Sequence, residues 1–157
     1  MSYEGETNLK ELLELAIRVE STSGALYRSA SGEMKEGKLR ELLEALASAK
    51  DQHIEMLRSW NEGPGEMVHA RYNAGLIGYV KRGEELSSRP GSSLLVVEFA
   101  INFEEEAIHF FESLRDEAGP DLGRVIQGVI EENGEFVERI RTLAYETLAG
   151  FRSPIQR

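Results

Sequence analysis

The sequence predicts an all-α protein, an antiparallel four-helix bundle with a long crossover between the second and third helices. Four long segments carry apolar residues at spacings of three and four, which is typical of amphipathic helices. About thirty residues separate the second segment from the third, too many for a helical hairpin turn. Such a length suits a connection along the side of a bundle. We expect one domain over residues 1–157, enough for a sizeable core.

The first predicted helix covers residues 7–33. Thr7 or Asn8 can cap its start, and Glu11 follows Asn8 at the spacing of a capping box. Its inward stripe is otherwise apolar or small, but Glu20 stands in the middle of it. A buried carboxylate is costly unless it is paired, protonated or bound to a metal ion. Glu20 is therefore the first candidate for a functional residue.

The second predicted helix covers residues 39–61, and the crossover covers 62–92. Apolar residues of this helix alternate with Lys50 and His53, which lie three residues apart and face inward. We expect Trp60 on the same inner face. Glycines and a proline at 63–65 predict the end of the helix. In the crossover, residues 72–85 predict a short helix.

The third and fourth predicted helices cover residues 93–118 and 121–148. Glu104 lies on the apolar side of the third helix, as Glu20 does in the first. The predicted inward stripe of the fourth helix is Leu122, Val125, Val129, Asn133, Phe136, Ile140 and Leu143.

The two halves of the chain resemble a repeat. Residues 16–20 align with residues 100–104, so that Glu20 falls on Glu104. Residues 53–57 align with residues 136–140 at nearly the same offset. The near-constant offset supports two copies of one helical hairpin.

Composition excludes several classes of function. The formal net charge of -10 argues against a nucleic acid or an anionic membrane as partner. The absence of cysteine excludes disulfides, thiolate metal sites and a cysteine nucleophile. No apolar run is long enough to span a membrane, and the acidic N-terminus does not read as a signal peptide. We therefore expect a cytoplasmic protein.

The inward polar residues follow the pattern of di-iron carboxylate bundles, in which two helices each give a glutamate and two give Glu-x-x-His. With these residues in this order, the chain resembles the rubrerythrin-like branch of the ferritin-like superfamily over about residues 8–148. By that resemblance, Glu20 and Glu104 match the two bridging glutamates, and His53 matches the first histidine.

Three positions depart from the family pattern. Lys50 stands where the resemblance implies the first Glu-x-x-His glutamate, and Asn133 and Phe136 replace both ligands of the second motif. Our first hypothesis is that the di-iron site is degraded and not catalytic. Lys50 then forms an ionic core cluster with Glu20, Glu104 and His53 in place of the metals, and Asn133 and Tyr27 belong to the same core.

The alternative hypothesis is a reduced metal site of Glu20, His53 and Glu104, holding iron or zinc. The resemblance then implies an oxidoreductase of rubrerythrin type that acts on oxygen or peroxide. The catalytic residues stay unassigned, and no cofactor is expected unless iron binds at this site. A third reading is an interaction module with an inert core. By resemblance we also expect a homodimer; the sequence names no physiological partner.

Overall fold

Four long helices form the body of the computed structural model, which describes residues 2–60, 67–73, 75–89, 91–148 and 151. Each begins and ends within two residues of its predicted limits. The four are α1 (Leu9–Gly32), α2 (Lys38–Trp60), α4 (Ser93–Glu117) and α5 (Pro120–Thr147). The predicted stop signal of α2 at 63–65 lies outside the described residues.

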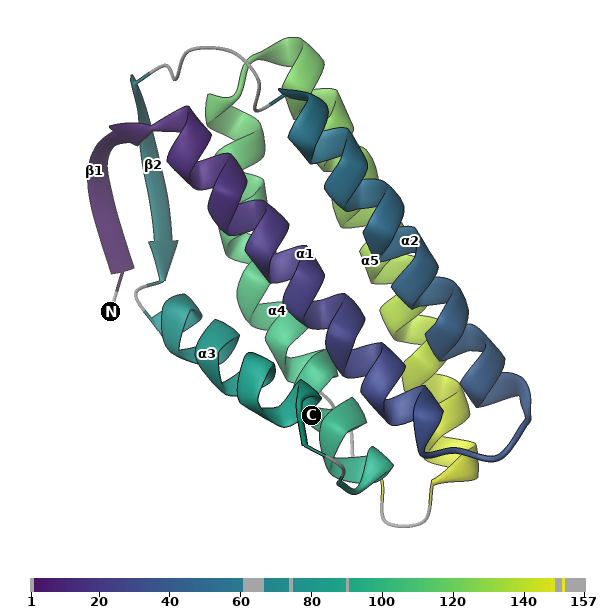
Figure 1. Cartoon of the computed structure of the whole chain (residues 1–157). Helices are drawn as coiled ribbons and strands as arrows, with labels where there is room; N and C mark the ends of the chain where they lie inside the picture. Colours follow the sequence, from purple (N-terminus) through teal and green to yellow (C-terminus); the bar gives the residue numbers. More distant parts are fainter. Residues whose placement is uncertain (1, 61–66, 74, 90, 149–150, 152–157) are drawn as a thin grey trace.

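The four helices pack around one shared interior (Figure 1). Helix α1 contacts α2 and α4, and α5 contacts the same two helices from the other side. Each consecutive pair is therefore a hairpin, and the two hairpins lie face to face. This is the predicted all-α bundle.

Local signals explain where the helices start. The side chain of Asn8 accepts a hydrogen bond from the backbone N–H of Lys10 at 2.8 Å, which makes Asn8 the N-cap of α1. Before α5, Gly119 adopts a φ of 84°, a left-handed conformation that favours glycine. Pro120 follows as the first residue of α5, where its missing N–H costs nothing.

The crossover contains structure that the sequence analysis did not predict. Strand β1 (Ser2–Asn8) pairs antiparallel with strand β2 (Met67–Asn73), so that Ser2 lies opposite Asn73 and Asn8 opposite Met67. The predicted short helix over 72–85 begins later, because residues up to 73 belong to β2. Helix α3 (Gly75–Ser87) then follows and contacts α1 and α4.

Helix α3 packs closely against the bundle through a glycine. A Cβ atom at Gly83 would lie 2.7 Å from Cγ2 of Thr22 in α1, nearer than packed carbon atoms approach. At the surface, Arg18 of α1 donates to Glu84 through Nε at 3.0 Å and Nη2 at 2.8 Å. These contacts hold the crossover against the α1 side of the bundle.

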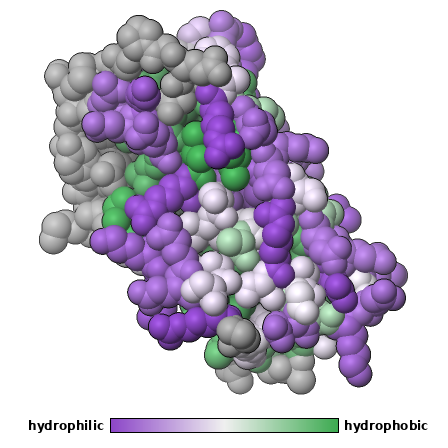
Figure 2. Space-filling model, viewed as in Figure 1, coloured by the Kyte–Doolittle hydropathy of each residue, from purple (hydrophilic) through white to green (hydrophobic). Residues whose placement is uncertain are grey.

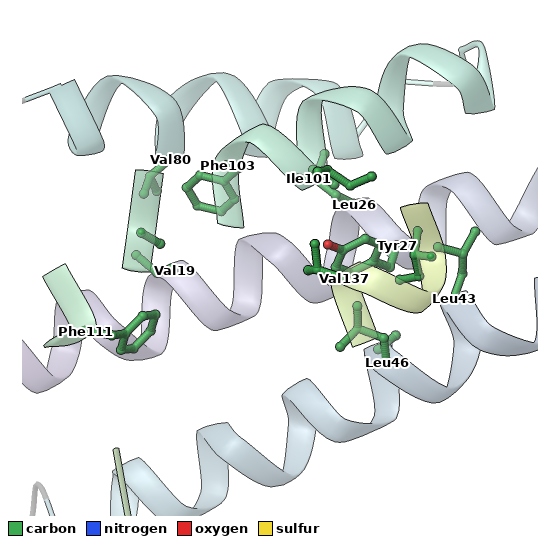
Figure 3. Packing of buried hydrophobic residues seen from close by; sticks show 14 of the residues in the cluster. Val19, Leu26, Tyr27, Leu43, Leu46, Val80, Ile101, Phe103, Phe111 and Val137 are labelled. Carbon is green, nitrogen blue, oxygen red and sulfur yellow. The ribbon is translucent and has the colours of Figure 1, made fainter. Parts of the chain in front are cut away.

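A single cluster of buried apolar residues fills the interior and draws on all the helices (Figure 3). Two details of the predicted inner faces are wrong. Trp60 is 44% exposed, because it is the last residue of α2 and lies at the end of the bundle. In α5, three residues of the predicted stripe are only half-buried and the residue after each is buried instead, so the inward stripe is displaced by one residue at Val125, Phe136 and Leu143.

Hydrophilic residues cover much of the described surface in the view of Figure 2, with smaller hydrophobic patches between them. Within the described residues, no helix combines the length and apolar character that crossing a membrane requires.

Candidate functional site

Lys50 lies at the centre of the bundle between two glutamates. Its Nζ atom is 2.7 Å from Oε2 of Glu20 in α1 and 2.7 Å from Oε1 of Glu104 in α4. The Lys50 and Glu20 side chains have no exposed surface, and that of Glu104 is 10% exposed. One ammonium group thus bridges the two carboxylates that face each other across the interior.

His53 lies one helical turn after Lys50 on α2 and contacts two further carboxylate oxygens. Its Nδ1 atom is 2.7 Å from Oε1 of Glu20, and its Nε2 atom is 2.7 Å from Oε1 of Glu132 in α5. A neutral imidazole carries only one N–H, but each carboxylate needs a donor. The geometry therefore fits the doubly protonated imidazolium.

Two neutral side chains complete the hydrogen bonds. Asn133 in α5 donates from Nδ2 to Oε1 of Glu20 at 3.2 Å, and it is itself buried. Ser23 in α1 donates its hydroxyl to Oε1 of Glu104. Glu20 thus accepts hydrogen bonds from α2 and α5, so one carboxylate of α1 fixes the positions of three side chains from two other helices.

The pKa values of the two central groups move in the directions that favour charge. Burial by itself raises the pKa of Glu20, but the Lys50 ammonium and His53 outweigh burial and lower the pKa from 4.5 to about 2. Burial likewise lowers the pKa of Lys50, and the charges of Glu104 and Glu20 outweigh it and raise the pKa. Both groups are therefore ionised at neutral pH.

The pKa of His53 is raised as well. Burial opposes the rise, while the hydrogen bond to Glu20 and the Glu20 charge produce it, and Glu132 adds to it. We define the core cluster as Glu20, Lys50, His53, Glu104 and Glu132 with the neutral Ser23 and Asn133. With three carboxylates against two cations, the ionised core cluster carries one net negative charge.

Tyr27 lies beside the core cluster without joining its hydrogen bonds. Burial raises the pKa of its phenol well above the usual value, and the charge of Glu104 adds to the rise. Ser23 and Glu104 are close to the hydroxyl, but they bond to each other. Within the described residues the buried Tyr27 hydroxyl has no hydrogen-bond partner.

The structure therefore brings Glu20, Lys50, His53, Glu104 and Asn133 into one cluster. Phe136 is half-buried and lies under the guanidinium of Arg139, with 5.8 Å from Cζ to the ring centroid.

Sequence reasoning did not find Glu132. The spacing of Glu-x-x-His directed attention to positions 133 and 136, whereas Glu132 comes one residue earlier, on the exposed edge of α5. Its side chain is 47% exposed, so apolar periodicity gave no signal. The one available signal was His53, since an inward imidazole has two nitrogens that both need partners.

A cavity of about 200 Å³ opens between α4 and α5 beside the core cluster. Glu104 and Asn133 line it, together with Glu105 and Glu138. Within the described part of the chain, no group of three or more His, Cys, Asp or Glu side chains has the arrangement of a metal site.

Four long helices, a lateral crossover and inward polar residues contributed by all four helices define a ferritin-like bundle protein. A family model described as rubrerythrin matches residues 11–143, which is most of the chain. The chain belongs to the rubrerythrin family. No curated protein and no solved structure matches it.

Proposed function

We propose that this rubrerythrin-family protein has a degraded di-iron site that is not catalytic, with the core cluster in place of the two metal ions. One observation carries the proposal: the buried ammonium of Lys50 bridges Glu20 and Glu104 at 2.7 Å each. A cation supplied by the chain occupies the position between the two carboxylates that would bridge the metals. It offsets part of the negative charge that metal ions at this position would neutralise.

The donor set does not fit a pair of iron ions. A di-iron bundle needs two glutamates and two Glu-x-x-His motifs. Here Lys50 replaces one ligand with a cation, and Asn133 and Phe136 occupy the second motif. His53 meets a carboxylate at both ring nitrogens, so neither nitrogen offers a lone pair while the imidazole is protonated.

The cluster can take a structural role without metal because each of its three carboxylates lies 2.7 Å from a cationic side chain. Removing one partner from a buried ion pair is strongly destabilising, since the other charge stays buried and unpaired. The contacts of Lys50, His53 and Asn133 together offset the free-energy cost of burying the Glu20 carboxylate. The four long helices are thereby held in one relative position.

A second candidate rests on the three core-cluster residues that match metal ligands of the family pattern, Glu20, His53 and Glu104. Two carboxylates and an imidazole can hold one iron or zinc ion with open positions. The protein would then be an oxidoreductase acting on oxygen or peroxide. This function requires that Lys50 leave its position and that His53 lose a proton. The contacts of both residues favour the first proposal.

Metal content separates the two proposals. The wild-type protein is loaded with iron(II) under anaerobic conditions and desalted, and bound metal is measured by plasma mass spectrometry. Zinc is loaded in parallel. We expect almost no bound metal in the wild type. One ion per chain that is lost in Glu104→Ala would favour the second proposal, and two ions per chain would contradict both.

Two variants of Lys50 make the experiment sharper. Lys50→Glu restores a carboxylate at the family position and removes the competing cation, so we expect it to gain bound iron. Lys50→Met removes the same cation but adds no ligand. If both variants bind metal equally, repulsion by Lys50 is the main obstacle. If only Lys50→Glu binds metal, the main obstacle to metal binding is the missing carboxylate ligand.

A further inference from the structure

The cavity between α4 and α5 has a floor that accepts hydrogen bonds. Asn133 lines it and is buried; its Nδ2 atom donates to Glu20, while its Oδ1 atom has no hydrogen-bond partner within the described residues. Glu104 lines it too. The contacts of Glu104 with Lys50 and Ser23 both use Oε1, which leaves Oε2 for another donor. A buried acceptor without a partner is costly, so this floor suits a ligand that donates.

The charges around the cavity also select the ligand. The core cluster has one more carboxylate than cations, and Glu104 is its member at the cavity. At the rim, Glu105 and Glu138 are engaged by Arg141, which bonds Glu138 and lies 3.7 Å from Oε1 of Glu105. One guanidinium faces two carboxylates at the rim, so the core cluster and the rim each have one more carboxylate than cations. An anionic ligand would meet carboxylates among the described lining residues, because Arg141, whose Nε and Nη2 atoms have no hydrogen-bond partner there, does not line the cavity.

The walls are apolar and the volume is small. Ile108 and Phe111 of α4 face Ile130 and Val137 of α5 across a space of about 200 Å³. An engineered cavity of about 150 Å³ with such walls binds benzene. The walls therefore suit a single ring or a short alkyl group.

We propose that this cavity binds a small organic ammonium ion, whose nitrogen donates to Glu104 and to Oδ1 of Asn133 and whose apolar body lies between α4 and α5. The ligand enters beside the core cluster and leaves Lys50 in place. This inference goes beyond the structural role of the cluster. A chelator is present in every binding experiment, so the result does not depend on whether the protein can bind metal.

The probe is benzylammonium, compared with benzyl alcohol and benzoate, which keep the ring but change the charge. Binding to the ¹⁵N-labelled full chain is followed by NMR chemical shifts of the backbone and of the Asn133 side-chain amide. We expect benzylammonium to shift Asn133, Gly134 and Ile108. We expect it to bind at least about tenfold more tightly than the alcohol, the loss typical of one charge-assisted hydrogen bond. Benzoate should not bind.

Gly134 provides a variant that blocks the cavity. It lines the cavity in the exposed part of α5, and a Cβ atom there would have no neighbour within 4 Å. Gly134→Leu should therefore fill the space and abolish binding. Gly128→Leu is the matched control, because Gly128 lies in the same helix, has equal room and does not line the cavity.

Several results would overturn the inference: no binding to the wild type, equal affinity for ammonium and alcohol, binding of benzoate, or unchanged binding in Gly134→Leu. If Gly134→Leu does not fold, the wild-type shifts decide. Shifts confined to the cavity residues support the site, and shifts elsewhere refute it.

Discussion

Lys50 Nζ lies 2.7 Å from Glu20 Oε2, and neither side chain has any surface in contact with solvent. The pair joins α1 to α2 in the interior of the bundle. Water cannot solvate either charge at this position. Each group is therefore ionised because of the other, and changing one of them changes the state of both.

Lys50→Met should lower the free energy of unfolding at pH 7 by about 3–5 kcal/mol, because Glu20 and Glu104 lose their shared cation inside the protein. The loss should shrink in acid, where the carboxylates can be protonated. Urea denaturation at pH 7 and pH 4 measures both. Lys38→Met, an exposed lysine in the same helix, is the control and should change little. A Lys50→Met protein as stable as the wild type would contradict the role of the cluster.

Acid should destabilise the protein through Glu20. The pKa of Glu20 falls from 4.5 to about 2 on folding, because Lys50 and His53 outweigh the effect of burial. A depressed carboxyl pKa contributes about 3 kcal/mol to the free energy of unfolding above pH 4.5. This contribution is lost as the pH falls toward 2. Denaturation curves across this range should decline less steeply in Glu20→Gln. Glu14→Gln, an exposed carboxylate of α1, should decline as the wild type does.

His53 should titrate above its usual pKa of 6.5 in the folded protein. A raised histidine pKa stabilises the fold fully below 6.5, and that contribution is lost as the pH rises through the folded value. NMR titration of the imidazole measures it. Glu132→Gln should lower the pKa of His53, because a neutral amide replaces the charged carboxylate at Nε2, while Glu131→Gln should not. An unchanged pKa in Glu132→Gln would contradict the contact at Nε2.

Tyr27→Phe should leave the free energy of unfolding unchanged or raise it by about 1 kcal/mol. The buried hydroxyl has no partner within the described residues, so its removal ends a desolvation cost. Tyr79→Phe is the matched comparison, because Asn102 donates to the Tyr79 hydroxyl at 3.2 Å. Loss of this hydrogen bond in Tyr79→Phe should lower the free energy of unfolding by about 0.5–1.5 kcal/mol. Thermal and urea unfolding measure both; a clear loss in Tyr27→Phe would show that its hydroxyl is bonded.

Gly83→Ala should destabilise the protein by about 1–3 kcal/mol, because the added methyl would meet Thr22 at 2.7 Å. Alanine otherwise stabilises a helix relative to glycine by about 0.5–1 kcal/mol. Gly78→Ala should show that gain, since nothing lies within 4 Å of a Cβ atom at Gly78 in the same helix. Urea denaturation measures both variants. Equal effects would mean that α3 packs less closely than described.

The helices could be predicted because each has a long apolar stripe and a local start signal. Asn8 is an example of a start signal, since the sequence shows both a residue type that caps helices and Glu11 three positions later. Strand β1 was missed for the opposite reason. Residues 2–8 have a central glycine and no alternation of apolar and polar side chains, so the pairing with β2 has no local signal.

The candidate site could be predicted only where burial and motif coincide. Glu20, Lys50 and His53 lie on a regular inward stripe, so their positions followed from spacing alone. The inward face of α5 was predicted less accurately, because Val125, Phe136 and Leu143 are each followed directly by another apolar residue, and periodicity did not decide between the two. Val137 is buried there and Phe136 is not. Which oxygen meets which nitrogen depends on the packing of four helices, which no single stripe specifies.

The core cluster also bears on the order of events in folding. Its contacts join residues 30 positions apart, as between Glu20 and Lys50, and 113 positions apart, as between Glu20 and Asn133. It cannot be complete until α5 has been synthesised and docked, after the α1–α2 hairpin has had time to form. Interactions made after the transition state slow unfolding more than they speed folding. The buried charges should therefore act mainly as a kinetic lock that lengthens the lifetime of the assembled bundle.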